Sequence, residues 1–255
     1  MLFVLLSKRF LHMTLLDGFA FVAIHANLLD CYNYVTDTDV AVQRFLRREL
    51  LALCPQAAFL GEEEESAGLT NAPTFVVDPI DGTINFMRNR RQSAVSIGLL
   101  ADKRPVLGVI YQPYADELFT AEKGKGAFCN GQAVHVSATP LEQAVVAFGT
   151  APYDAELAEK SMAAARAFLL RAGDLRRTGS AAVDLCDVAC GRADVFFELR
   201  LRPWDVAAGS LIVAEAGGGF FSLGKEAPYY DGPCGVLAVN APCREAARAI
   251  LEAVL

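Results

Sequence analysis

Apolar residues recur at two different periods along this chain, and the change of period divides it into segments. Up to residue 53 the spacing is helical, which predicts helices over residues 3–30 and Asp39–Leu53. Between residues 74 and 137, short apolar runs stand between turn residues, a pattern typical of an antiparallel sheet. The expected strands are TFVVD, SAVSIGLL, PVLGVIYQP, ELFTAEKG and the two arms of GKGAFCNGQAVHVS, where Asn130-Gly131 is a strong hairpin signal.

The pattern changes again after Pro140, where strands and helices alternate. Strands are expected over residues 144–150 and 193–199, and helices over residues 154–173, 181–192, 205–218 and 243–255. We therefore expect one unit of mixed α+β and α/β character over residues 1–255. Its first half (1–140) combines helices with an antiparallel sheet, and its second half (141–255) alternates.

Composition narrows the class of protein. A chain of 255 residues buries roughly 70 to 75% of its unfolded surface, and 53% of these residues are hydrophobic, so the protein is expected to be globular. A net charge of -7 argues against nucleic-acid binding, and basic groups such as Arg176-Arg177 are interpreted as solvated surface. The absence of a run of 18 or more uncharged apolar residues argues against a membrane span.

The N-terminus and the cysteines indicate the compartment. The apolar first thirty residues are interrupted by Lys8, Arg9 and Asp17, and the positive charges follow the first apolar run, so a helix is favoured over a secretory signal. The seven cysteines contain no CxxC pair, which fits reduced thiols in a cytoplasmic protein. Cys186 and Cys190, one helical turn apart, are interpreted as small buried hydrophobes, in preference to a metal or redox pair.

The stretch VVDPIDGTINF places two aspartates at the end of a buried strand. Asp78 follows three apolar residues, Pro79 keeps the chain extended, and Asp81 comes one turn later beside Gly82. Carboxylate and carbonyl oxygens without a nearby histidine or cysteine suit Mg2+, Mn2+ or Ca2+ and disfavour zinc. Aspartate beside proline and glycine is also ordinary turn chemistry, so this stretch by itself leaves a metal site and a capped turn open.

Two further acidic stretches favour the metal site. FLGEEEESAG places Glu62 after an apolar run, and RPWDVAAG places Asp205 at the start of a small-residue helix, where it could also serve as a cap. The chain resembles the inositol monophosphatase family of Mg2+-dependent phosphomonoesterases in three motifs that follow one another in this order: GEE, DPIDGTINF and WDVAAG. VTDTD, GKGAFCNGQ, GSAA and FFE extend the resemblance over nearly the whole chain, and they imply the family's layered α-β-α-β-α sandwich.

The resemblance implies a two-metal site. Glu62, Asp78 and the backbone carbonyl of Ile80 would bind one Mg2+, and Asp78, Asp81 and Asp205 would bind the second. A third Mg2+ beside Glu63, or Mn2+ in place of Mg2+, is compatible with the same residues. Two such metals can clamp the attacking and leaving oxygens of an in-line displacement at phosphorus.

The resemblance also assigns catalytic and substrate residues. Catalytic roles fall to Glu62 and to the pair that orients the attacking water, Asp39 and Thr83. The N–H groups of Gly82 and Thr83 would hold phosphate oxygens. The residues that match substrate-binding positions are Asp81, Thr150, Gly179, Ser180, Ala181, Glu198 and Asp205. Glu64 and Glu65 are interpreted as solvated, and Trp204 as packing that fixes Asp205.

The chain departs from the family pattern at Leu28, where several members carry a lysine near the third metal. Inositol monophosphate is the favoured substrate, and fructose 1,6-bisphosphate and 3'-phosphoadenosine nucleotides are the alternatives. For fructose 1,6-bisphosphate, Arg200 or Arg202 would meet the second phosphate; the other interpretation of both arginines is a surface loop. The resemblance further implies a homodimer that acts on a small phosphorylated polyol or sugar, without membrane or nucleic-acid partners. A different class of function, a regulatory protein that binds the transcription machinery, is the remaining alternative. The three histidines and the missing GxSxG, Walker and HExxH motifs argue against other hydrolases and kinases.

Overall fold

The structure, a computed structural model, describes residues 36–63 and 68–255. The predicted helix over residues 3–30, the departure at Leu28 and the residues Glu64 and Glu65 lie outside the described residues. Among the described residues, no helix combines the length and the apolar character that crossing a membrane requires.

The first sheet has seven strands within the described residues, in the order β1-β2-β3-β4-β5-β6-β7. Its strands are β1 (Ala58–Gly61), β2 (Thr74–Asp81), β3 (Ala94–Ala101), β4 (Arg104–Gln112), β5 (Glu117–Glu122), β6 (Ala127–Cys129) and β7 (Gln132–Val134). The strands from β2 to β7 pair antiparallel, as the sequence predicts, whereas β1 pairs parallel with β2. The β6–β7 hairpin turns at Asn130-Gly131, both with positive φ.

The second sheet has five strands within the described part of the chain, in the order β11-β12-β10-β8-β9. These are β8 (Val145–Phe148), β9 (Asp174–Arg176), β10 (Val195–Leu201), β11 (Gly219–Ser222) and β12 (Cys234–Val239). Strands β8, β9 and β10 pair parallel, and β11, β12 and β10 pair antiparallel. The strand pattern finds β8 and β10 but misses β9, β11 and β12.

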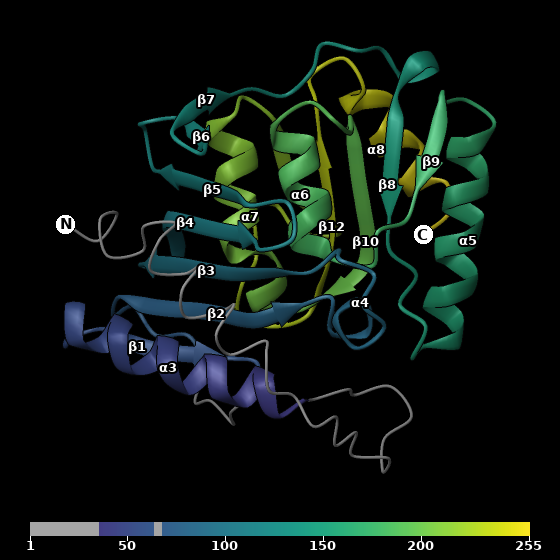
Figure 1. Cartoon of the computed structure of the whole chain (residues 1–255). Helices are drawn as coiled ribbons and strands as arrows, with labels where there is room; N and C mark the ends of the chain where they lie inside the picture. Colours follow the sequence, from purple (N-terminus) through teal and green to yellow (C-terminus); the bar gives the residue numbers. More distant parts are fainter. Residues whose placement is uncertain (1–35, 64–67) are drawn as a thin grey trace.

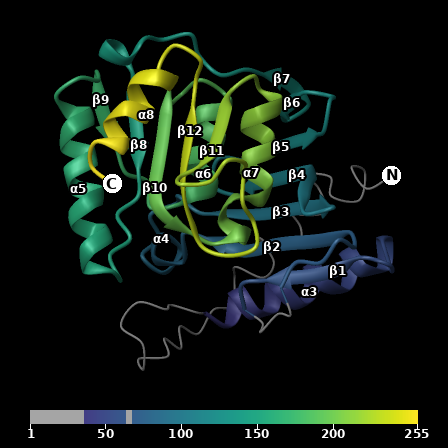
Figure 2. The ribbon, with the colours of Figure 1, turned by 180° about the vertical axis from the view of Figure 1, so that it is seen from behind.

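The helices complete five layers, as Figures 1 and 2 show. They are α3 (Asp37–Leu53), α4 (Thr83–Met87), the 3-10 turn η1 (Leu141–Gln143), α5 (Ala155–Leu169), α6 (Ala181–Ala189), α7 (Pro203–Glu215) and α8 (Arg244–Glu252). Helix α3 covers the outer face of the first sheet, α6 and α7 lie between the two sheets, and α5 and α8 cover the outer face of the second. The layered α-β-α-β-α sandwich is therefore confirmed.

Alternation along the strands decides which side chains reach the middle layer. In β2, Phe75 and Val77 pack with α3, whereas Val76 packs with α6 and α7. Because side chains on a strand alternate between faces, Asp78 lies on the same face as Val76 and points toward the middle layer. The same period in β10 places Phe196 in the middle layer and, two residues on, Glu198. The strands thus carry acidic side chains to one end of the layer that holds α6 and α7.

Two glycines let α7 approach the first sheet closely. A Cβ on Gly98 in β3 would lie 2.8 Å from Cβ of Ala207, and a Cβ on Gly108 in β4 would lie 2.6 Å from the carbonyl oxygen of Ala208. Neither distance leaves room for a larger residue. These contacts set how deeply α7, which begins two residues before Asp205, sits on the sheet.

Candidate functional site

Asp78 ends the regular part of β2 and is almost completely buried. Its Oδ1 accepts a hydrogen bond of 3.0 Å from the N–H of Ile80, which fixes the carboxylate. Pro79 has no N–H to offer the sheet, and the pairing of β2 with β3 shifts register between Asp78 and Asp81. The shift brings both aspartates to the same side of the strand end.

Asp81 lies against the N-terminus of α6. Its Oδ2 accepts hydrogen bonds from the Ser180 hydroxyl and, at 2.7 Å, from the N–H of Ala182. Ser180 is the N-cap of α6, and its Oγ accepts from the N–H of Val183. A carboxylate at this position is stabilised by the free N–H groups at a helix start. The turn after Asp81 depends on Gly82, whose φ of 84° is in the left-handed region.

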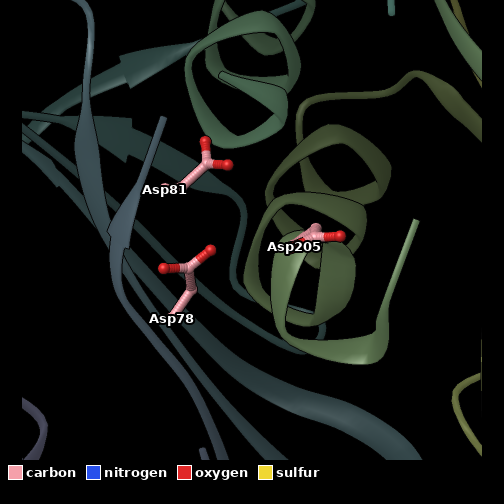
Figure 3. A group of neighbouring side chains, drawn as sticks. All are labelled: Asp78, Asp81 and Asp205. Carbon is pink, nitrogen blue, oxygen red and sulfur yellow. The ribbon is translucent and has the colours of Figure 1, made fainter. Parts of the chain in front are cut away.

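Asp205 comes from α7, on the opposite side of the same space. Pro203 opens the helix, and Oδ2 of Asp205 accepts a 2.6 Å hydrogen bond from the N–H of Arg202. Asp205 is therefore not the N-cap, a position that Arg202 occupies, but the N3 residue of a capping box. One carboxylate oxygen from each of Asp78, Asp81 and Asp205 lies within 4.8 Å of the others. Figure 3 shows the three side chains, two at the strand end and one at the helix start, turned toward one another.

Glu62 reaches this cluster through the parallel strand that the sequence analysis missed. Gly61 of β1 pairs with Val77, and the N–H of Glu62 donates to the carbonyl of Val77 at 3.3 Å. Burial, and then the charges of Asp205 and neighbouring acids, raise the pKa of Glu62 to about 9, while a hydrogen bond with Asp78 opposes the shift. The pairing therefore brings Glu62 and Asp78, sixteen residues apart, into direct contact.

The other acids at the centre show the same electrostatic strain. Burial is the largest cause of the pKa shift of each of these acids. It raises the pKa of Asp205 to about 7, and the charge of Asp81 adds to the shift. The pKa of Asp81 rises to about 6, and its hydrogen bonds to Ser180 and the start of α6 limit the increase. The pKa of Asp78 is raised well above the usual value, through burial and the charges of Glu62 and Asp81.

This donor set fits a hard divalent cation. Four carboxylates converge, and a cation among them would offset the repulsion that raises their pKa values. All the donors are oxygens, the ligands that Mg2+, Mn2+ and Ca2+ prefer, and the described residues place neither histidine nor cysteine in the group. The carbonyl of Ile80 adds a further oxygen, which accepts from the Thr83 hydroxyl at 3.1 Å.

The predicted water-orienting pair also meets at this end of the molecule. Asp39 lies in the first turn of α3, fully buried, where the N–H of Thr36 donates to its Oδ2 at 2.8 Å. Burial raises the pKa of Asp39, and hydrogen bonds from Thr36 and then Thr83 oppose the increase. Asp39 and Thr83, separated in sequence by β1 and β2, are therefore neighbours. Glu63 lies close by, because the charge of Asp39 helps to raise its pKa to about 7.

The predicted substrate residues form the other side of the space. Burial, followed by the charges of Asp205 and Asp81, raises the pKa of Glu198 to about 8. Gly149 makes room for this side chain, since a Cβ there would lie 2.0 Å from the Glu198 carboxylate. The adjacent Thr150 hydroxyl accepts a 3.4 Å hydrogen bond from Arg177. Gly179, Ser180 and Ala181 lead into α6 beside Asp81.

Two residues at the site were not predicted from the sequence. Arg177 is exposed, as the sequence analysis expects of a basic surface group, and its Nη2 donates to the Thr150 hydroxyl at 3.4 Å. Asn85 is buried and ties α4 to the segment before α6, with hydrogen bonds from Nδ2 to the carbonyls of Gln92 at 2.7 Å and Thr178 at 3.0 Å. The conspicuous position of an asparagine in DGTINF was a usable signal for Asn85. For Arg177 the only signal was its nearness to GSAA.

Comparison with known proteins decides the family. The sequence profile described as the inositol monophosphatase family matches residues 26–254. The chain belongs to the inositol monophosphatase family. The resemblance drawn from GEE, DPIDGTINF and WDVAAG is thereby confirmed.

Individual members of the inositol monophosphatase family resemble the chain over most of its length. "Inositol monophosphatase 2" of Solanum lycopersicum is 45% identical over 193 residues, which is 72% of each chain. "Nus factor SuhB" of Xylella fastidiosa is 39% identical over 214 residues, covering 82% of this chain and 78% of that protein. The crystal structure of the suppressor protein suhB from Bartonella henselae superimposes with a TM-score of 0.81 at 32% identity, covering 96% and 95% of the two chains.

Proposed function

We propose that this protein hydrolyses a small phosphomonoester in the presence of Mg2+, with inositol monophosphate as the first choice of substrate and inositol and phosphate as products. The observation that carries the proposal is the convergence of Asp78, Asp81 and Asp205 within 4.8 Å, beside Glu62 and Glu198. Membership of the inositol monophosphatase family and the relatives named for this activity support it.

The residues present would hold two Mg2+ ions. Glu62, Asp78 and the Ile80 carbonyl would bind one, and Asp78, Asp81 and Asp205 the other, with Asp78 shared. Glu63 would contribute to a third ion, and Mn2+ suits the same oxygens. When bound, such ions supply Lewis-acid stabilisation of charge at the phosphoryl oxygens and lower the pKa of water.

The chain's own groups would orient the reactants. We expect the Thr83 hydroxyl and the Asp39 carboxylate to position the attacking water, because the two are neighbours at the edge of the acidic centre. Glu62 lies close enough to the same centre to share this catalytic role. The N–H groups of Gly82 and Thr83 would bind phosphate oxygens. On the leaving-group side, Glu198, Thr150, Ser180 and the backbone of Gly179 and Ala181 would bind hydroxyl groups, together with Asp81 and Asp205.

The test is phosphate release from three substrates, inositol 1-phosphate, fructose 1,6-bisphosphate and a 3'-phosphoadenosine nucleotide, each with Mg2+ and with EDTA. We expect phosphate release from inositol 1-phosphate in Mg2+ and none in EDTA. Failure of the folded protein to hydrolyse any of these phosphomonoesters in Mg2+ would contradict the proposal.

A second candidate function is regulatory. The relative called "Nus factor SuhB", at 39% identity, favours a binding role beside catalysis. Retention of purified RNA polymerase by the immobilised protein, with bovine serum albumin as the control, would support it.

We also propose that the protein is a cytoplasmic homodimer. Sedimentation at two protein concentrations tests the dimer.

A further inference from the structure

Arg177 extends over the substrate side of the acidic centre. It lies between β9 and α6, and its Nη2 is 3.4 Å from the Thr150 hydroxyl. Its Nη1 is 3.2 Å from the position that a Cβ would occupy on Gly179. The positive charge of Arg177 also lowers the pKa of Glu198, against the larger effect of burial. Three residues of the substrate side therefore surround this one guanidinium group.

The neighbouring arginines are occupied elsewhere. Arg176 donates to the carboxylate of Asp174 and, at 2.7 Å, to the Leu175 carbonyl. Arg200 forms an ion pair of 3.3 Å with Asp154. Arg202 lies 6.0 Å above the Trp204 ring. Of the two arginines that the sequence analysis considered for a second phosphate, Arg200 is already paired, and Arg202 is turned to the tryptophan.

Arg177 has spare hydrogen-bonding capacity and spare charge. A guanidinium group carries five N–H donors, and Thr150 takes one of them at a long distance. Within the described residues, no carboxylate is within ion-pair distance of Arg177. A planar, charged donor of this kind matches a phosphate or carboxylate with two parallel hydrogen bonds.

We propose that Arg177 forms an anion subsite on the leaving-group side, which binds the second acidic group of substrates that carry one in addition to the phosphate that is cleaved. The inference rests on the proposed phosphatase function and extends its substrate class beyond inositol monophosphate. Hydroxyl groups of the leaving group meet Glu198 and Thr150, and a second phosphate meets Arg177. Arg177 is then a residue that determines specificity, through binding.

The test compares kcat/KM for inositol 1-phosphate, fructose 1,6-bisphosphate and 3'-phosphoadenosine 5'-phosphate in the wild type and in Arg177→Gln, Arg177→Lys and Arg176→Gln. Arg176→Gln is the matched control, because Arg176 is the adjacent exposed arginine and its hydrogen bonds point to β9. A charge-assisted hydrogen bond predicts that Arg177→Gln lowers kcat/KM for at least one substrate with two phosphates about 10- to 100-fold more than for inositol 1-phosphate, mainly through KM.

Arg177→Lys keeps the charge without the planar fork, so we expect it to recover part of this loss, and Arg176→Gln to leave the substrate ratio unchanged. Equal losses on all three substrates, or a wild type that hydrolyses inositol 1-phosphate but neither of the others, would overturn the subsite and leave the proposed function standing. A wild type that hydrolyses none of the three would instead overturn the proposed function. Circular dichroism and melting temperature establish whether each variant is folded. If Arg177→Gln is not folded, Arg177→Lys is compared with the wild type instead.

Discussion

Asp81 combines a structural contact with a charge, and substitution can separate the two. In Asp81→Asn the amide oxygen still accepts from Ser180 and Ala182, but one negative charge leaves the centre. Because metal ions supply several kcal/mol of transition-state stabilisation, we expect a loss of kcat of about a hundredfold or more. The melting temperature in EDTA should not fall, since burial already disfavours the ionised carboxylate of Asp81.

The measurements are steady-state phosphate release, Mg2+ titration and melting in EDTA. Asp102→Asn is the control, because Asp102 lies in the turn between β3 and β4 and takes a left-handed φ of 49° that asparagine also adopts. Turnover near the wild-type value in Asp81→Asn would contradict the two-metal assignment. A large fall in the metal-free melting temperature would show instead that Asp81 is structural.

At the residue scale, the position of a side chain can be predicted from the sequence where the adjacent residues indicate its local structure. Asp78 could be predicted because an apolar run, a proline and a glycine surround it, whereas Glu198 was assigned only through the family resemblance. The contact of Arg177 with Thr150 could not be predicted, because an arginine in a basic pair is usually solvated and the contact depends on the parallel pairing of β8 with β9. Such contacts are set by tertiary packing, which residue types alone do not specify.

At the element scale, the packing of α7 on the first sheet controls the position of Asp205. Gly108→Ala would bring a Cβ to 2.6 Å from the backbone carbonyl of Ala208, and a backbone atom cannot rotate aside. We therefore expect α7 to shift, at a cost of about 1–3 kcal/mol of unfolding free energy. The Mg2+ affinity should fall as well, because Asp205 moves relative to Asp78. Chemical denaturation in EDTA and calorimetric Mg2+ titration measure the two effects.

Gly232→Ala is the matched control for this substitution. A Cβ on Gly232 would lie 3.5 Å from the Tyr229 hydroxyl, an ordinary contact in a surface loop. We expect little change in either stability or Mg2+ binding. If Gly108→Ala behaves like this control, the close approach of β4 and α7 does not determine the geometry of the centre.

Two of the missed strands are very short, and β1 pairs with a strand that is distant in sequence. Strand β9 has three residues and β11 has four, too few for a period of two to stand out. Strand β1, which carries Glu62 toward Asp78, pairs parallel with β2 across a long connection. The long helices and the β3–β4–β5 meander were predictable because local spacing and turn residues specify them. Parallel edge strands depend on partners that are distant in sequence.

At the scale of the whole molecule, the site collects residues from position 39 to position 205 at one end of the middle layer. Sequence spacing indicates which acids lie at the ends of apolar segments. It does not indicate that α3, β1, β2 and α7 bring these acids together. The family resemblance supplied that step, because a fold fixes long-range geometry that periodicity does not contain. The repulsion among these acids then makes the stability of the entire chain depend on pH and on metal.

The sign of this dependence follows from the pKa shifts. Asp81, Asp205 and Glu62 have folded-state pKa values raised to about 6, 7 and 9. A carboxyl group with a raised pKa stabilises the fold fully below its unfolded pKa of about 4, and that contribution is lost as the pH rises through the folded value. The metal-free protein should therefore lose stability steadily between pH 4 and pH 9, and most of the loss above pH 6 comes from the acidic centre.

Mg2+ should reverse this loss, because it binds the deprotonated carboxylates that protons otherwise occupy. We expect the rise in melting temperature on adding saturating Mg2+ to grow from pH 6 to pH 9, and to correspond to about 2.7 kcal/mol at a hundredfold excess over Kd. Differential scanning calorimetry in EDTA and in MgCl2 at four pH values measures it. Asp81→Asn should show a smaller increment at each pH, because one ligand charge is gone. A Mg2+ increment that stays constant from pH 6 to pH 9 would show that protons and metal do not compete for these carboxylates, and the acidic centre would then not be the site where Mg2+ stabilises the protein.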